Sequence, residues 1–136
     1  MPYVRISLLK GKPAAHVRAI ADSLHQALVD AFGVPPKDRF QIVQQLAPDE
    51  FIFDRNYLFG PRSDDFVLVH ITVGRPRDAA MREAFYQRAV ACLGEAPGLR
   101  PEDVMIVMST TQTDEWSFGC GVAGVLGGRA TPALTG

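Results

Sequence analysis

The sequence predicts an α/β domain of the α+β sandwich kind, in which tandem β-α-β units form a four-stranded mixed sheet with two helices on one face. Three observations predict it. Strand-like segments flank each of two long amphipathic stretches, this order occurs twice, and 136 residues are enough for one hydrophobic core. The strands within each β-α-β unit are expected to be parallel, with the helix laid across the sheet.

The first unit is expected to span about residues 2–53. Residues 3–9 alternate between apolar and polar side chains, which is typical of a strand. Residues 14–32 have apolar side chains at helical spacing, and Gly33 provides a C-terminal stop. Residues 39–46 alternate more weakly and predict the second strand of the unit.

The second unit is expected to span about residues 66–118. Its segments are a β-branched strand at 66–73, a helix at 77–94 and another strand at 103–110. The residues expected to form the buried stripe of this helix are Met81, Ala84, Phe85, Ala89 and Cys92.

Short motifs recur in the same order in both units. "GKP" matches "GRP", "PKD" matches "PED", and "DEFIF" from Asp49 matches "DEWSF" from Asp114. The matches predict two halves related by a pseudo-twofold axis within one domain of residues 1–126, followed by a flexible Gly- and Ala-rich tail at 127–136. The alternative is that unrelated β-α-β units share these turn signals.

The face of the sheet away from the helices is expected to need a partner. Its candidate residues are Val67, Val69, Ile71 and Val73, or the residues that alternate with them. Either set is apolar enough to predict an oligomer.

Composition excludes several classes of function. The formal net charge is −1 with basic residues scattered along the chain, so no nucleic-acid or anionic-membrane partner is expected. No segment reaches the roughly 20 apolar residues that cross a bilayer. The two cysteines are far apart and outside any CxxC pair, so we expect a cytoplasmic protein without a disulfide framework.

No metal or cofactor is expected. The three histidines, His16, His25 and His70, are isolated and form neither an HxH nor an HExxH pattern.

Pro2 is the first candidate catalytic residue. Removal of the methionine before it would leave a free secondary amine, and α-amino groups titrate near pH 7.7–8.0 in peptides. A neutral amine could abstract a proton beside a carbonyl, whereas a protonated amine could polarise a carbonyl. If Met1 is retained, Pro2 is only a residue at the start of a strand.

Arg75 and Arg77 are candidate ligands of a carboxylate. Pro76 between them favours extended geometry, in which residues i and i+2 point the same way. Two guanidinium groups could therefore converge on one anion and bind it with parallel donors. The alternative is a pair of solvated turn arginines, and the first unit has Lys12 and Ala14 at the matching positions.

These features resemble the tautomerase superfamily. Within it, the segments "FGVPPKDRFQ", "GRPR" and "DEWSFGCG" are similar to those of malonate semialdehyde decarboxylases, and the resemblance covers about residues 2–126. It implies a homotrimer in which an amino-terminal proline is the catalytic group. It also implies that Arg75 and Arg77 bind the carboxylate of the substrate and that Asp38 is an acid near Pro2.

Two aromatic residues complete the candidate site. Trp116 and Phe118 could form an apolar wall that excludes water, or they could share a packing role with their first-unit counterparts Phe51 and Phe53. Asp38 could likewise be a turn residue, as its counterpart Asp103 indicates. The chain has Val125 where the resemblance implies a phenylalanine.

The predicted function is cofactor-free decarboxylation of a small 3-oxo acid of the malonate semialdehyde type. Pro2, Asp38, Arg75 and Arg77 would be catalytic, and Arg75, Arg77, Trp116 and Phe118 would bind the substrate. One alternative is a keto-enol tautomerase that acts on 2-hydroxydienoate or phenylenolpyruvate acids. The other is a catalytically silent trimer that binds carboxylates.

Overall fold

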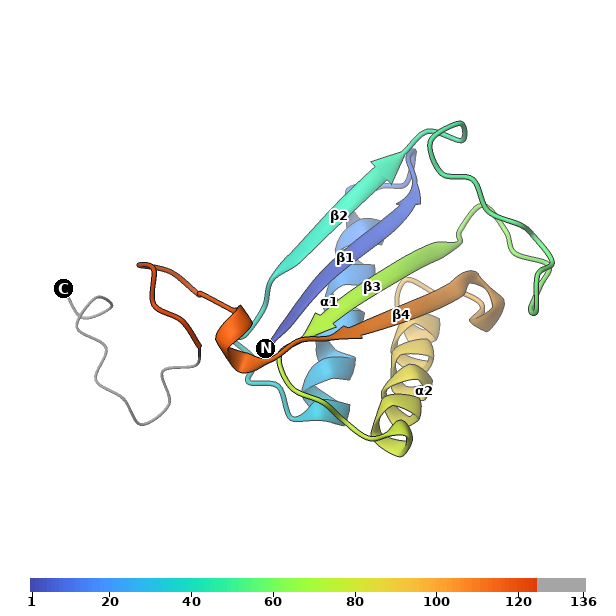
Figure 1. The fold of residues 1–136 in the computed structure, drawn as a ribbon. Coiled ribbons are helices and arrows are strands. Elements are labelled where there is room, and N and C mark those ends of the chain that lie inside the picture. Colours follow the sequence, from blue (N-terminus) through green and yellow to red (C-terminus); the bar gives the residue numbers. More distant parts are fainter. Residues whose placement is uncertain (125–136) are drawn as a thin grey trace.

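A computed structural model describes residues 1–124 of the chain. The tail predicted at 127–136 and Val125 lie outside the described residues. The described part is a sheet of order β2-β1-β3-β4 with two helices, α1 and α2, on one side (Figure 1). This is the predicted fold class.

The elements follow the predicted order. The first unit contains β1 (Pro2–Leu9), α1 (Ala14–Phe32) and β2 (Gln41–Leu46), and the second contains β3 (Val67–Val73), α2 (Ala79–Glu95) and β4 (Val104–Thr110). Two 3₁₀ turns flank β4, η1 (Pro101–Asp103) and η2 (Thr113–Glu115). The ends of α1 are those predicted from its apolar spacing and from Gly33, which adopts the left-handed conformation after the helix.

The pairing of the strands confirms the mixed sheet. β1 and β2 are parallel, β3 and β4 are parallel, and β1 and β3 are antiparallel at the centre. Val4 pairs with Gln41 and Val67 with Val104, so partners are 37 positions apart in both units (41 − 4 and 104 − 67). The two halves of the sheet therefore have the same internal register.

The turns after the two helices differ, although the strands match. Asp38 lies three residues before β2 starts at Gln41, whereas Asp103 directly precedes β4. The match of "PKD" with "PED" thus aligns two aspartates that stand at different distances from their strands. The connections from helix to strand, 33–40 and 96–103, are equally long, so Asp38 lies two positions further from its strand than Asp103 does.

The helix-facing side of the sheet forms the core. Val67, Val69, Ile71 and Val73 are all buried in one cluster with both helices. The residues that alternate with them face the open side, so the structure decides between the two sets that the sequence left open. They are Leu68, His70 and Thr72.

The buried stripe of α2 differs from the prediction. Phe85, Ala89 and Cys92 are buried as expected, together with Leu93. Met81 and Ala84 are exposed, so their placement in the core was wrong. Both lie in the first two turns of α2.

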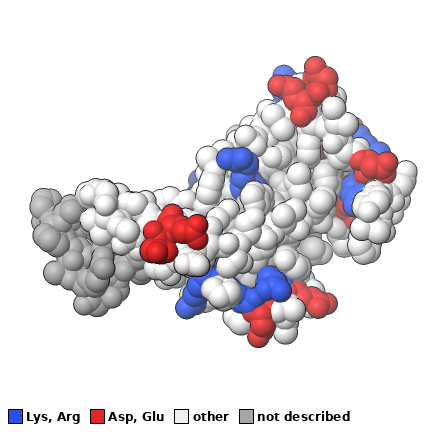
Figure 2. All heavy atoms as spheres, in the orientation of Figure 1, with Lys and Arg blue, Asp and Glu red and all other residues white. Residues whose placement is uncertain are grey.

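The open side of the sheet mixes apolar and polar residues. Ile42, Met105 and Val107 are exposed there, beside Arg5 and His70. Seen from the side of Figure 1, charged side chains lie in separate groups and do not form a stripe (Figure 2). Among residues 1–124, no helix is long and apolar enough to span a membrane.

Candidate active site

The structure brings the six predicted site residues to one end of the sheet, which we call the Pro2 end. Pro2 begins β1 and Asp38 lies in the turn before β2. Arg75 and Arg77 follow β3, while Trp116 and Phe118 follow β4. β1 and β2 start at this end and β3 and β4 finish there, as the positions of the amino terminus and η2 show (Figure 1).

Asp38 lies beside the amino terminus. Its Oδ2 atom is 3.0 Å from the amino group of Met1. Its Oδ1 atom is buried and has no hydrogen-bond partner among the described residues. One oxygen of Asp38 thus contacts an amine, and the other can accept a hydrogen bond from a water molecule or a ligand.

Asp103 differs from Asp38 because both of its oxygens are occupied. They accept hydrogen bonds from the backbone N–H of Ser63 at 2.7 Å, from the Ser63 hydroxyl at 2.6 Å and from Arg100 Nε at 3.3 Å. Asp103 is a structural turn residue. Its role gives no reason to assign the same role to Asp38.

Arg77 is a buried cation. Only 7% of its surface is exposed, and its guanidinium lies 4.5 Å from the centre of the Phe32 ring. Its Nη1 atom donates to the Arg75 carbonyl at 3.1 Å, while its buried Nε has no partner in the described part of the chain. Burial lowers the pKa of Arg77, and the charge of Arg75 lowers it further.

Arg75 is exposed, unlike Arg77. The extended geometry predicted for this turn does not give the two side chains equal surroundings, because Arg77 packs against α1. Neither guanidinium forms an ion pair within residues 1–124. Two neighbouring cations without a counter-ion are suited to bind an anion.

The aromatic residues stack beside the amino terminus. The Trp116 and Phe118 rings are 5.5 Å apart, and the Phe118 ring is 5.9 Å from Phe40. The Phe40 carbonyl accepts a hydrogen bond from Val4, two residues from Pro2. Sequence analysis missed Phe40 as a site residue, because it placed this residue within the predicted strand at 39–46, whereas β2 starts at Gln41.

The first-unit counterparts of these aromatics have a different environment. Phe51 and Phe53 pack with Phe66 in a small hydrophobic cluster, and Phe51 is buried. Phe118, in contrast, is 45% exposed. A shared packing role therefore does not explain Trp116 and Phe118.

Thr111 connects β4 to this site, and no sequence pattern had indicated it. Its hydroxyl accepts a hydrogen bond from Trp116 Nε1 and donates to the Val73 carbonyl at 2.8 Å. Val73 pairs with Pro2 across the sheet. Thr111 thus fixes the aromatic wall relative to the strand beside Pro2.

At the opposite end of the sheet, the cation that corresponds to this arginine pair has an ion-pair partner. Lys12, which corresponds to Arg75, forms an ion pair with Asp65. At the Pro2 end, in contrast, neither Arg75 nor Arg77 forms an ion pair with another residue of 1–124.

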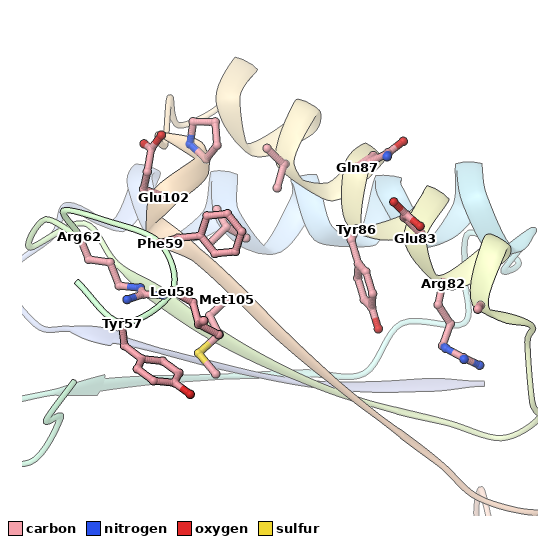
Figure 3. Close-up of a pocket in the computed structure, with 14 residues that line it drawn as sticks. Tyr57, Leu58, Phe59, Arg62, Arg82, Glu83, Tyr86, Gln87, Glu102 and Met105 are labelled. Carbon is pink, nitrogen blue, oxygen red and sulfur yellow. The ribbon is translucent and has the colours of Figure 1, made fainter. Parts of the chain in front are cut away.

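A large cavity lies elsewhere on the described part of the chain. It has a volume of about 1050 Å³ between α2, the edge strand β4 and the loop at residues 57–62. Tyr57, Leu58 and Phe59 lie on the loop side, facing Arg82 and Tyr86 of α2 (Figure 3). None of the six predicted residues lines it, and its arginines are occupied by the carbonyls of Asp54 and Arg77.

No group of three or more potential metal ligands occurs within residues 1–124.

Comparisons with known proteins agree with this fold. Two family models, both described as tautomerase enzymes, match residues 38–119 and residues 2–58. The chain is 32% identical over 123 residues to the probable tautomerase YusQ of Bacillus subtilis (strain 168), covering 90% of this chain and 97% of YusQ. It is 28% identical over 129 residues to the probable tautomerase YrdN of the same organism, covering 95% and 99%.

Two solved structures are also similar. A malonate semialdehyde decarboxylase, solved in wild-type, mutant and inactivated forms, is 34% identical with a TM-score of 0.82, over 88% of this chain and 92% of that chain. The FG41 malonate semialdehyde decarboxylase inhibited by 3-bromopropiolate is 30% identical with a TM-score of 0.82, over 88% and 91%. On its sequence and its fold, this chain belongs to the tautomerase family.

Proposed function

We propose that the chain is an enzyme that decarboxylates a small 3-oxo acid such as malonate semialdehyde, with the amine of Pro2 as its catalytic group. The observation that supports this most is Arg77, a buried guanidinium that forms no ion pair within residues 1–124. It lies in the turn after β3, whose last residue, Val73, pairs with Pro2. A buried unpaired charge is costly, and a bound carboxylate would compensate it. The similarity to two malonate semialdehyde decarboxylases supports the choice of substrate.

The proposed reaction needs no added electron acceptor, because the carbonyl of a 3-oxo acid is itself the sink. Arg75 and Arg77 hold the carboxylate so that the bond to the neighbouring carbon overlaps the carbonyl π system. That bond breaks, carbon dioxide leaves, and its electron pair forms an enolate. Protonated Pro2 stabilises the developing negative charge on the oxygen, and a proton returned to carbon gives the aldehyde.

Asp38 and the aromatic residues support this chemistry in the proposal. Asp38 contacts the amino group of Met1, the residue before Pro2, and in protein without Met1 it would favour the protonated form of the Pro2 amine. Trp116 and Phe118, with Phe40, would shield the site from water.

We also propose that the protein is a homotrimer. The apolar residues on the open side of the sheet, Ile42, Met105 and Val107, would be covered by other copies.

The alternative is a keto-enol tautomerase in which neutral Pro2 is a base. The specific finding in its favour is that both curated relatives are named probable tautomerases. The two functions require opposite protonation states of the same nitrogen.

An assay of the purified protein separates these functions. Mass spectrometry first establishes that Met1 is absent, and the protein is then tested with malonate semialdehyde and with phenylenolpyruvate over a range of pH. The proposal predicts acetaldehyde formation that declines as Pro2 deprotonates. Tautomerisation alone, rising as Pro2 deprotonates, supports the alternative, and carboxylate binding without turnover supports a silent trimer.

A further inference from the structure

Met1 fills a space beside the candidate catalytic residues. Its side chain is only 13% exposed, and its amino group contacts Asp38. Its carbonyl oxygen accepts a hydrogen bond from the backbone N–H of Gly74 at 3.0 Å. Removal of Met1, which the proposed function requires, would leave the buried Gly74 N–H without this acceptor.

The position of the Met1 carbonyl is close to the Pro2 nitrogen. A carbonyl oxygen and the following nitrogen are bonded to the same carbon and lie about 2 Å apart. An oxygen bound near this position after removal of Met1 would thus lie within reach of both the Gly74 N–H and the Pro2 amine. The Met1 carbonyl thus marks a position beside both groups that an oxygen atom can occupy.

The direction of the Gly74 N–H is fixed by Thr111. The Val73 carbonyl, which belongs to the same peptide group, accepts hydrogen bonds from the Thr111 N–H at 2.9 Å and from its hydroxyl at 2.8 Å. Because a peptide group is planar and trans, anchoring this oxygen directs the N–H the opposite way, toward Met1. The donor is therefore preorganised.

A side chain at position 74 would enter the space that Met1 fills. Its φ is not in the left-handed region, so its backbone would accept other residues. A Cβ atom there would collide with the methyl group of Met1 and lie 3.0 Å from its Cβ. The matching Gly11 shows the reverse, because it has a φ of 113° and open space around it.

We propose that the backbone N–H of Gly74 is a catalytic hydrogen-bond donor to the carbonyl oxygen of the 3-oxo acid. This inference rests on the proposed function and adds one donor to it. As the carbon–carbon bond breaks and its electron pair moves toward this oxygen, the Gly74 N–H and the Pro2 amine share the developing charge. The space now filled by Met1 receives the substrate.

Gly74→Ala in the Met1-free protein tests the use of this space. The new methyl group would occupy the position of the substrate, so kcat/KM for malonate semialdehyde should fall about 100-fold or more, while the thermal unfolding temperature should change little. Gly94→Ala is the matched control, since the nearest atom to its Cβ is an ordinary 3.8 Å away, and it should retain full activity. Full activity of Gly74→Ala would overturn the inference.

A second pair of variants tests the direction of the donor. Thr111→Val removes the hydroxyl and should lower kcat about 10-fold, whereas Thr111→Ser should restore it.

Malonate added to ¹⁵N-labelled protein should shift the Gly74 amide proton downfield. An unshifted Gly74 amide in an active enzyme that binds malonate would refute the donor alone. A protein that neither turns over the substrate nor binds malonate would refute the proposed function itself.

Discussion

Arg77 and Arg75 have similar sequence surroundings but different environments. Pro76 and the spacing of the two arginines identified the pair. They did not reveal that Arg77 is the buried member, because its burial depends on Phe32, which lies 45 positions earlier at the end of α1 (77 − 32). Phe40 and Thr111 escaped prediction for the same reason. An exposed aromatic residue and a threonine can be assigned to the site only when the fold shows which residues lie next to them.

Arg77→Met tests the role of this residue. Two charge-assisted hydrogen bonds to a substrate are worth about 3–6 kcal/mol together, so kcat/KM should fall about 100-fold or more. Stability should stay equal or rise, since methionine removes a buried charge without a counter-ion and can still pack on Phe32. Arg18→Met, at a solvent-exposed position on α1, is the control for both measurements. Retained activity with a lower unfolding temperature would make Arg77 a structural residue.

At the scale of elements, the sequence predicted every strand and helix and the parallel pairing within each unit. Period and turn signals determine these features locally. How much of a helix surface is buried depends on the elements that pack against it, which the local sequence does not show. Met81 was therefore wrongly placed in the core. The turns after the helices were also misread, because "PKD" and "PED" match as motifs while the distances to β2 and β4 differ.

Asp103 anchors the turn before β4, and its titration should be visible in the stability of the protein. Burial alone would raise the pKa of Asp103, but hydrogen bonds from Ser63 and Arg100 hold it below the ordinary value. A lowered pKa in the folded state stabilises the fold above the ordinary aspartate pKa of about 3.9, and this contribution is lost as the pH falls further.

Asp103→Asn should therefore reduce the free energy of unfolding by about 1–3 kcal/mol at pH 7. The difference from the wild type should shrink in acid, below pH about 4. Urea denaturation at several pH values measures this, with the exposed Asp49→Asn as the control. A difference that is constant from pH 7 to pH 3 would show that the carboxylate charge is irrelevant.

Across the whole molecule, the two halves have the same strand register, but the cations in their corresponding turns have different partners. Lys12 is paired with Asp65 at one end of the sheet, while Arg75 and Arg77 remain unpaired at the other. The repeated motifs predicted the symmetry. The motifs alone did not show at which end the cations lack ion-pair partners, because those partners come from distant parts of the sequence.

The open side of the sheet should form the contact between copies. Val107→Glu places a charge among the apolar residues of this side and should convert a particle of three chains into single chains, as measured by light scattering. Met81→Glu, at a similarly exposed position on α2, should leave the assembly intact. A wild-type protein that is monomeric at micromolar concentration would contradict the proposed trimer.

A free imino group at Pro2 is central to the proposed chemistry. The most direct measurement compares the turnover of malonate semialdehyde by protein without Met1 and by protein that keeps a short extension before Pro2, with both masses verified. We predict acetaldehyde formation by the first and at least a 100-fold lower rate for the second, because an amide nitrogen can neither hold nor donate the proton. Equal rates would show that the chemistry does not use Pro2.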